Sequence, residues 1–308
     1  MNEQTSQPSR WKRLARRWRL VVGLGLLGSL VHVVGPGELL AVFSRASPGL
    51  LFLLVVLLAV WLLLGAANVW ILLRSLKEIP FLVFLRVYAV SWATSLLLPG
   101  QLGDSTQVLF LRRYDVPMAS SGAAYLIDKA LSLFWMLAVA AAGLGHYASF
   151  PWTWIAGLMV AGVIGVVSTY GLWRSFSRRS WGRLESARIR ISRLAAQGAT
   201  FRHRRGVLML NSSNTILKWV LLTWIYQVAF AAFDQEIGWF HAATYPVVSS
   251  LVGYLPITAG GAGTMEWTAV ALFGSLGVPA VDVLAAYLVL RAILIGSAFG
   301  VLALVRLA

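Results

Sequence analysis

The sequence of 308 residues contains no cysteine, and its four histidines lie far apart along the chain. It therefore has no disulfide framework, no thiol nucleophile and none of the spacings by which Cys and His bind a metal. Charge is scarce too, because only 12% of the residues are Asp, Glu, Lys or Arg. These absences argue against a disulfide-stapled secreted domain and against the common metalloenzymes, so we expect no metal and no cofactor.

Apolar residues make up 59% of the chain, and the mean hydropathy is +0.76. This composition is typical of a polytopic membrane protein rather than of soluble domains. Runs near the length that spans a bilayer, about 20 residues, fall at 19–34, 49–73, 118–145, 152–173, 207–233 and 280–305. The basic residues before the first run resemble a secretory signal, but no cleavage site is evident, so we interpret this run as a retained span.

Two further apolar runs are broken by proline and glycine. Residues 80–98 are followed by Pro99, Gly100, Gln101, Gly103 and Asp104. Residues 242–255 are followed by Pro256, Gly260, Gly261 and Gly263. Non-helical backbone at membrane depth is tolerated only inside the protein or beside a watery cavity. We therefore predict that both segments are re-entrant helical hairpins whose tips form sites.

The two halves of the chain resemble each other. Val116–Lys129 (VPMASSGAAYLIDK) is echoed 162 residues later by Val278–Arg291 (VPAVDVLAAYLVLR). The same offset aligns Asp104 with Glu266, so each half places an acid 25 residues before a base. This internal duplication assigns a first repeat to residues 49–145 and a second repeat to residues 207–305.

The net charge of the chain is +15, and the positions of its basic residues determine the expected topology. If each hairpin returns to the side it came from, the basic N-terminus 1–18, Arg74, Arg112 and the segment 174–206 all lie on one side. The positive-inside rule makes this the cytoplasmic side. We therefore expect an all-α polytopic membrane protein of about six full spans plus two re-entrant hairpins arranged as an inverted repeat. It would lie in the bacterial cytoplasmic (inner) membrane with both termini in the cytoplasm.

The segment 174–206 carries ten arginines against one acid, Glu185. This segment either fixes the topology or docks on anionic lipid headgroups. Because the basic residues border apolar runs instead of forming an aromatic-rich soluble module, we expect membrane lipids as partners and no nucleic acid. A lipid-synthesis enzyme and a second copy of the chain are the other candidate partners.

Six charged side chains lie in the apolar runs or at the hairpins: Asp104, Asp128, Lys129, Lys218, Glu266 and Arg291. A charge at the bilayer centre costs about 2.5–3.5 kcal/mol on insertion scales, so these groups must pair or be hydrated. Asp128 and Lys129 are neighbours about 100° apart on a helix, and each needs a different partner. The acids at the hairpins, Asp104 and Glu266, are the natural partners for the bases.

Basic and amide side chains are the candidate substrate-binding residues, namely Lys129, Arg291, Lys218, Asn211, Asn214 and Gln101. The candidates for gating or coupling are the acids and the hairpin-breaking residues: Asp104, Asp128, Glu266, Pro99, Gly100, Gly103, Pro256, Gly260, Gly261 and Gly263. No catalytic residue is assigned. The spacing of Asn211, Asn214 and Lys218 places them on one helix face.

Each of these features also has a purely structural interpretation. The ion pairs would pin the hairpins to neighbouring helices. The polar stripe that includes Asn211 and Asn214 would supply interhelical hydrogen bonds. An acid in the first turn of a hairpin helix would cap that helix, as readily as it would bind substrate or a proton.

With these residues in view, the chain from about residue 15 to its end resembles the flippase-like membrane region of lysylphosphatidylglycerol synthases and the stand-alone YbhN-like family. The matching pieces are LPGQLGD at Leu98–Asp104, the helix bearing Asp128 and Lys129, and LPITAGGAGTMEW at Leu255–Trp267 followed by LVLRAI at Leu288–Ile293. The resemblance implies a lipid-translocation fold with two re-entrant elements and a cavity for lipid headgroups. Gln101 stands where the family often has a base, and Lys129 where arginine is usual.

The leading hypothesis is a lipid flippase or translocase that moves a polar or anionic lipid through a charged midplane groove. Aminoacyl-phospholipids, glycolipids and polyprenyl phosphates are the candidate substrates. An intramembrane lipid-modifying enzyme is a weaker alternative, because the chain offers no histidine partner and no dense constellation of acids. A non-transporting scaffold that holds a lipid-synthesis enzyme through the arginine-rich segment is the third hypothesis.

Overall fold

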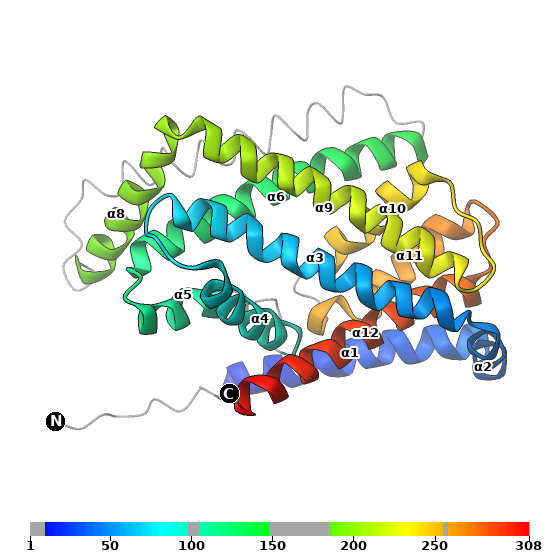
Figure 1. The fold of residues 1–308 in the computed structure, drawn as a ribbon. Helices are drawn as coiled ribbons and strands as arrows, with labels where there is room; N and C mark the ends of the chain where they lie inside the picture. Colours follow the sequence, from blue (N-terminus) through cyan, green and yellow to red (C-terminus); the bar gives the residue numbers. More distant parts are fainter. Residues whose placement is uncertain (1–9, 98–104, 148–184, 255–257, 308) are drawn as a thin grey trace.

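The computed structural model describes residues 10–97, 105–147, 185–254 and 258–307. Within these ranges the chain forms eleven α-helices and no strand (Figure 1), which confirms the all-α prediction. The tip of the first hairpin, with Pro99, Gly100, Gln101, Gly103 and Asp104, lies outside the described residues. So do Pro256 and the predicted span 152–173.

Three helices in the described ranges are long and apolar enough to cross a membrane: α3 (Pro48–Arg74), α6 (Met118–Tyr147) and α12 (Ala280–Leu307). A fourth span results if α1 (Arg10–Val34) and α2 (Pro36–Arg45), bent by 81°, count as one. These helices confirm a membrane protein, while the count of six spans remains a prediction. The helix α9 (Arg205–Ala231) is as long as α3, but its polar residues make it less apolar.

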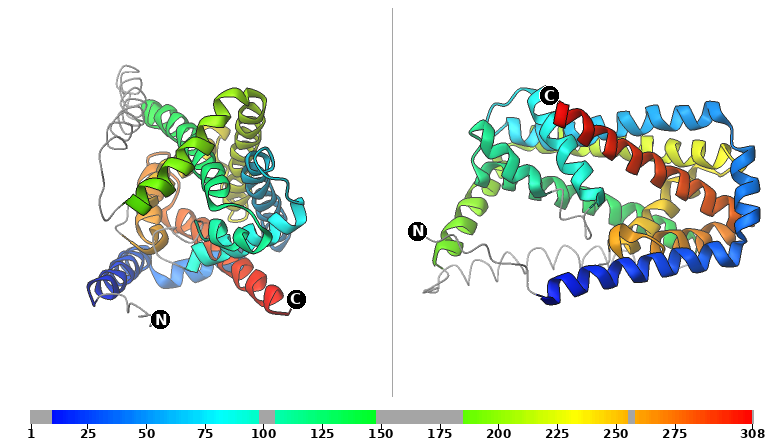
Figure 2. Two further views of the ribbon diagram at one scale, coloured as in Figure 1. Left: turned by 90° about the vertical axis from the view of Figure 1, so that its left-hand side faces the viewer. Right: turned by 90° about the horizontal axis from the view of Figure 1, so that it is seen from below.

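The bend between α1 and α2 follows from the residues at their junction. Gly35 adopts φ +92°, a conformation that glycine reaches without a steric penalty, and Pro36 then opens the next helix. Leu39 and Val42 are buried on one face of α2, while Leu40 on another face is exposed. Figure 2 shows α2 crossing the end of the helical bundle, nearly perpendicular to the long helices.

The first hairpin region lies between α3 and α6 and consists of α4 (Phe81–Leu97), the short α5 (Thr106–Phe110) and the 3₁₀ turn η2 (Leu111–Tyr114). Ile79, just before α4, and Val116, just before α6, belong to one buried cluster. The chain therefore enters and leaves this region at the same end of the molecule, where α3 ends and α6 begins (Figure 1). We call this end the basic end.

The second hairpin region lies between α9 and α12 and consists of α10 (Trp239–Tyr254), the short turn η5 (Ala259–Gly261) and α11 (Thr264–Gly274). Gln235 follows α9 and donates a hydrogen bond of 2.8 Å to Asp282 in the first turn of α12. Entry and exit therefore lie together, at the end of the molecule opposite the basic end.

Packing pairs the two halves of the chain. The helices α3 and α9 run side by side in opposite directions (Figures 1 and 2). The helix α4 of the first half packs against α12 of the second, and α10 of the second packs against α6 of the first. The helices α6 and α12 begin at Met118 and Ala280, which stand at the 162-residue offset of the sequence repeat.

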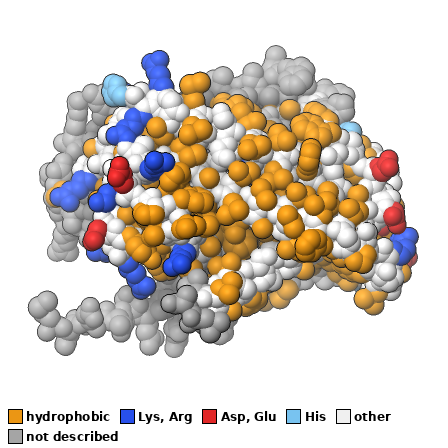
Figure 3. Space-filling view, viewed as in Figure 1, with side chains coloured by type: hydrophobic (Ala, Val, Ile, Leu, Met, Phe, Trp, Pro, Cys, Tyr) orange, Lys and Arg blue, Asp and Glu red, His pale blue; other side chains and the backbone are white. Residues whose placement is uncertain are grey.

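On the face that Figure 3 shows, charged side chains gather at the two ends of the molecule, with an apolar belt between them. The basic end carries the arginines of η2, of the turn η4 (Thr200–His203) that joins α8 (Glu185–Ala199) to α9, and the one at the end of α3. The opposite end carries Glu38, Asp234 and Asp282, with Arg45 as a base among them. This is the distribution expected if the belt lies in the bilayer and the basic end faces the cytoplasm.

Candidate functional site

The ion pair between Glu266 and Arg291 joins the first turn of α11 to the middle of α12. The Nε atom of Arg291 donates to Oε1 of Glu266 at 2.8 Å, and Nη2 lies 2.6 Å from the same oxygen. The side chain of Glu266 is 1% exposed, whereas that of Arg291 remains 24% exposed. The pairing that the sequence predicts between these two residues is therefore present, and only its base retains open surface.

The glycine-rich tip of the second hairpin region holds Glu266 in place. Gly260, Gly261 and Gly263 adopt φ of +60°, +70° and +81°, which favours glycine at all three positions. The backbone N–H of Gly263 donates to Oε2 of Glu266 at 2.7 Å, forming the side-chain half of a capping box. Glu266 thus caps α11 with one oxygen and pairs with Arg291 through the other.

Arg291 also bridges back to the tip, because its Nη1 atom lies 3.4 Å from the carbonyl oxygen of Gly260. A guanidinium carries five N–H groups, and the carboxylate and this carbonyl accept three of them. The two remaining N–H groups lie on the two terminal nitrogens, and guanidinium N–H groups bind phosphates and carboxylates well. The site can therefore bind an anionic or hydrogen-bond-accepting group without first breaking the ion pair.

The helix α1 packs directly on the glycine-rich tip, a contact that the sequence interpretation missed. The indole N–H of Trp267 donates to the carbonyl oxygen of Leu26 at 3.0 Å. A Cβ atom on Gly263 would lie 2.5 Å from Cβ of Leu26 and 2.9 Å from the carbonyl oxygen of Gly23. The one sequence feature that indicated a close contact of α1 was its glycines, since glycines permit close helix packing in membranes.

A second polar centre, the amide network, joins α3, α6 and α9. Asn211 donates to the carbonyl oxygen of Asn68 at 2.8 Å and to Oδ1 of Asp128 at 3.2 Å. Asn68 donates to Thr215 Oγ1 at 3.0 Å, and Asn214 donates to Asn68 Oδ1 and to the Leu64 carbonyl. Asn68, Asp128, Asn211 and Thr215 are buried, and Asn211 has no exposed surface at all. In this conformation Asn211, at the centre of the network, is surrounded by protein on every side.

The two lysines predicted to bind substrate contact aromatic rings. Lys129 Nζ lies 5.4 Å from the ring centroid of Tyr125, and Lys218 Nζ lies 4.9 Å from that of Trp61. Cation–π contacts of this kind stabilise a cation in a poorly hydrated place. Asp128, the neighbour of Lys129 on α6, accepts a hydrogen bond from Asn211.

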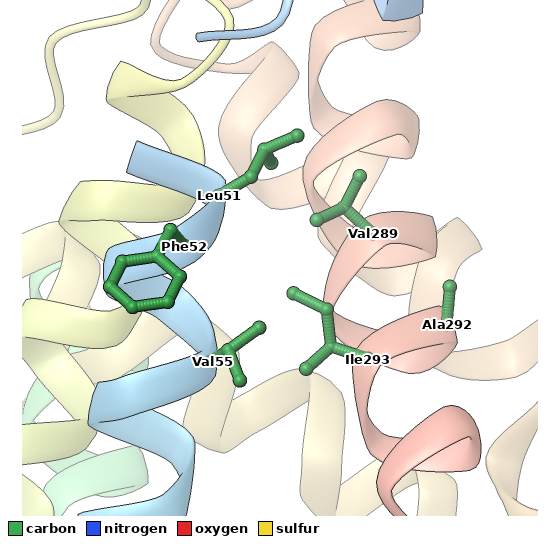
Figure 4. A pocket seen from close by; sticks show the side chains of 6 residues that line it. All are labelled: Leu51, Phe52, Val55, Val289, Ala292 and Ile293. Atoms are coloured by element: carbon green, nitrogen blue, oxygen red, sulfur yellow. The ribbon is translucent and has the colours of Figure 1, made fainter. Parts of the chain in front are cut away.

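An apolar groove of about 320 Å³ lies between α3 and α12 (Figure 4). Leu51, Phe52 and Val55 of α3 face Val289 and Ile293 of α12 across it, and Ala292 completes its wall. Arg291 stands two positions from Val289 and from Ile293, about 200° around the helix. The groove is therefore on the other side of α12 from the ion pair. Among the described residues, no group of three or more Asp, Glu or His lies close enough to hold a metal ion.

The chain matches the family described as the lysylphosphatidylglycerol synthase TM region over residues 17–300. The chain belongs to this family. The match covers both polar centres and every helix from α2 to α11, and it confirms the resemblance noted in the sequence. This family membership makes the chain a membrane protein related to lipid metabolism.

The chain is also 24% identical to a UPF0104 membrane protein of Methanothermobacter thermautotrophicus, over 84% of this chain and 85% of the relative. No solved structure matches the chain significantly.

Proposed function

We propose that this chain moves a polar or anionic lipid between membrane leaflets, and that Arg291 is its main headgroup-binding residue. The observation that carries the proposal is a partly exposed guanidinium in the middle of an apolar helix, held by a fully buried carboxylate and by a glycine-rich tip. Intramembrane charges of this kind mark substrate pathways in membrane proteins. Membership of a lipid-related family supports a lipid as the substrate.

The transport architecture is part of the same proposal. We infer six full spans and two re-entrant hairpins arranged as an inverted repeat, with the two hairpins entering from opposite ends. The reciprocal packing of α4 on α12 and of α10 on α6 supports this arrangement. Inverted repeats with broken helices allow one half to rock against the other around a midplane site.

The residue roles are part of the same proposal. Glu266 positions Arg291 and rigidifies the tip, while Lys129, at the equivalent place in the first repeat, forms the second headgroup-binding position. Lys218 and Gln101 line the path between them in this proposal, and Asp104 and Asp128 are the candidates for coupling. We assign Asn211 and Asn214 to holding α3, α6 and α9 together, because their side chains bond to groups of these helices.

The proposal has the chain in a bacterial cytoplasmic membrane with both termini in the cytoplasm. The arginine-rich segment 174–206 would then contact anionic headgroups of the inner leaflet. It assigns the chain no catalytic step, so lipids recovered after transport should be chemically unchanged. Lipid mass spectrometry before and after the assay tests this point.

The test is translocation of fluorescent lipids by the protein in liposomes, with the aminoacylated, glycosylated and polyprenyl-phosphate classes compared. Changing both Lys129 and Arg291 to Gln removes charge-assisted hydrogen bonds that contribute about 1.5–3 kcal/mol each. The rate should fall by about tenfold or more, since each 1.4 kcal/mol is a factor of ten. The matched control changes two exposed arginines of η2, Arg112 and Arg113, to Gln. A folded Lys129→Gln/Arg291→Gln protein that transports at the parental rate would refute the assignment.

A further inference from the structure

The glycine-rich tip lies between α1 and the ion pair. On one side Gly263 lies against Gly23 and Leu26 of α1, at distances that leave no room for a Cβ atom. On the other side its N–H is bonded to Glu266, which holds Arg291. A molecule that reaches Arg291 from the bilayer along this side must therefore displace α1 from the tip.

A cleft of about 330 Å³ opens at the surface beside this contact. Its walls come from α1, α10 and α11, and its lining residues are Leu26, Ser29, Val252, Thr264, Trp267 and Thr268. The cleft lies on the face of α11 opposite Glu266, because positions 264, 267 and 268 share one helix face and position 266 lies on the other. One face of α11 therefore lines the cleft, and the opposite face carries Glu266 of the ion pair.

The side-chain polar hydrogens of the residues that line the cleft are all bonded within the protein. The hydroxyl groups of Ser29, Thr264 and Thr268 donate to the carbonyl oxygens of Leu26, Gly261 and Thr264, at 2.8, 3.1 and 2.8 Å. The indole N–H of Trp267 is likewise bonded to Leu26. With these donors occupied, the cleft presents mainly methyl, methylene and ring carbon. Such a lining suits the hydrocarbon chain of a lipid better than its headgroup.

We propose that this cleft is the mouth of a lateral portal through which a membrane lipid reaches Arg291, and that α1 is the gate of the portal. The proposal rests on the proposed lipid transport. The acyl chains of the lipid occupy the carbon-lined cleft, while its polar headgroup passes the parted tip to Arg291. In the structure described here the gate is closed by the contact of Gly23 and Leu26 with the tip. Opening requires α1 to separate from the hairpin and the tip backbone between α1 and Arg291 to move aside, while the Glu266–Arg291 pair stays intact.

The absence of cysteine makes a direct test available. A Cβ atom on Gly23 would lie 3.7 Å from Cβ of Ala262, within the range of about 3.5–4.5 Å that a disulfide requires. The variant Gly23→Cys/Ala262→Cys should therefore oxidise to a disulfide that locks α1 on the tip. Each single variant, treated with the same oxidant, is a matched control, and reduction of the double variant supplies the unlocked state of the same molecule.

Two readouts are taken on the same liposomes. The first is photolabelling of the α12 peptide that contains Arg291 by a phosphatidylglycerol analogue with a diazirine in its headgroup. The second is the rate of lipid translocation. Locking the gate should lower both by about tenfold, as when a lid sets the rate of exchange, and reduction should restore both to the level of the single variants.

The outcomes separate the portal from the transport function. Equal labelling of Arg291's peptide in the locked and reduced states, or no labelling in either, would overturn the portal. If the two cysteines failed to form a disulfide, this would contradict the contact between α1 and the tip and overturn the proposed gate. Labelling that depends on the lock, in a protein that moves no lipid in any state, would support the portal and refute the proposed transport.

Discussion

The two polar centres of this protein differ in how their side chains are buried and bonded. At the tip of the second hairpin region, a buried carboxylate holds a guanidinium that keeps 24% of its surface exposed. In the amide network of α3, α6 and α9, neutral amides and one hydroxyl bond mainly to each other and to backbone carbonyls, and Asn211 has no exposed surface. The first centre keeps hydrogen-bonding capacity at a surface, whereas the second uses most of its capacity to join helices.

Under the proposed function, this difference separates a polar group that would bind a ligand from polar groups that hold the fold. A polar stripe and a paired charge both break an apolar pattern, so they look alike in a sequence. Burial and bonding of each side chain distinguish them, because a group surrounded by protein is unable to meet a substrate without a rearrangement. The following variants test the distinction, from the largest expected effect to the smallest.

Removing one member of the ion pair should have the largest effect on stability. Arg291→Met leaves the carboxylate of Glu266 buried without its cation, which typically costs about 3–5 kcal/mol. Thermal unfolding in detergent should show a marked loss of stability. The double variant Glu266→Met/Arg291→Met removes both charges and should recover the part of that loss that comes from the unpaired carboxylate, although the N–H of Gly263 then lacks its acceptor. A single variant as stable as the parent would contradict the burial and pairing described for Glu266.

Alanine at Gly263 should destabilise the protein more than alanine at Gly260. Both positions have positive φ, so both substitutions strain the backbone, which costs roughly 1–2 kcal/mol. Only at position 263 does the new Cβ also collide with α1, since nothing lies within 4 Å of a Cβ at position 260. The matched pair therefore isolates the contact between α1 and the tip. Equal melting temperatures for the two variants would show that this contact contributes nothing to the stability of the protein.

The amide network should respond mildly to loss of one hydroxyl. Thr215→Val keeps the shape of the side chain but removes the acceptor of Asn68 and the donor to the Asn211 carbonyl. Interhelical hydrogen bonds in membranes contribute about 0.6 kcal/mol on average, up to about 1.7. We expect a stability loss in this range and an unchanged translocation rate per folded molecule. If the translocation rate fell by more than the folded fraction did, the amide network would take part in transport.

Trp267→Phe should have the smallest effect. The change deletes one hydrogen bond to Leu26 at an exposed position but keeps an aromatic ring against α1. Net contributions of single hydrogen bonds are about 0.5–1.5 kcal/mol, and exposure places this one at the low end. Reaction of a cysteine at position 23 with a maleimide should become faster as the gate loosens. An unchanged reaction rate would mean that the indole does not help to hold α1.

The sequence predicts part of this structure because some of its signals are local. Prolines before α6 and α12 and the repeated VP…AAYL pattern locate both helices, and the shared offset of acid and base identifies the partners Glu266 and Arg291. The glycine-rich turn also predicts a helix break. These features depend on nearby residues, and local patterns specify them well.

Other parts of the structure depend on contacts between distant segments, and the sequence holds little signal for them. Nothing near Gly23 indicates that it meets a turn some 240 residues later. The spacing of Asn211 and Asn214 places them on one face of α9, but it does not say whether that face meets a substrate or α3. Packing decides both questions, and a single sequence does not encode packing in a readable pattern.

The most direct test of the account compares translocation per folded molecule in liposomes for Glu266→Met/Arg291→Met and for Thr215→Val. If the ion-pair centre binds the lipid and the amide network holds the helices, the double methionine variant should be folded and stable but transport at least about tenfold more slowly. Thr215→Val should be slightly less stable but transport at the parental rate. Parental transport by the double methionine variant, with transport lost in Thr215→Val, would contradict the account.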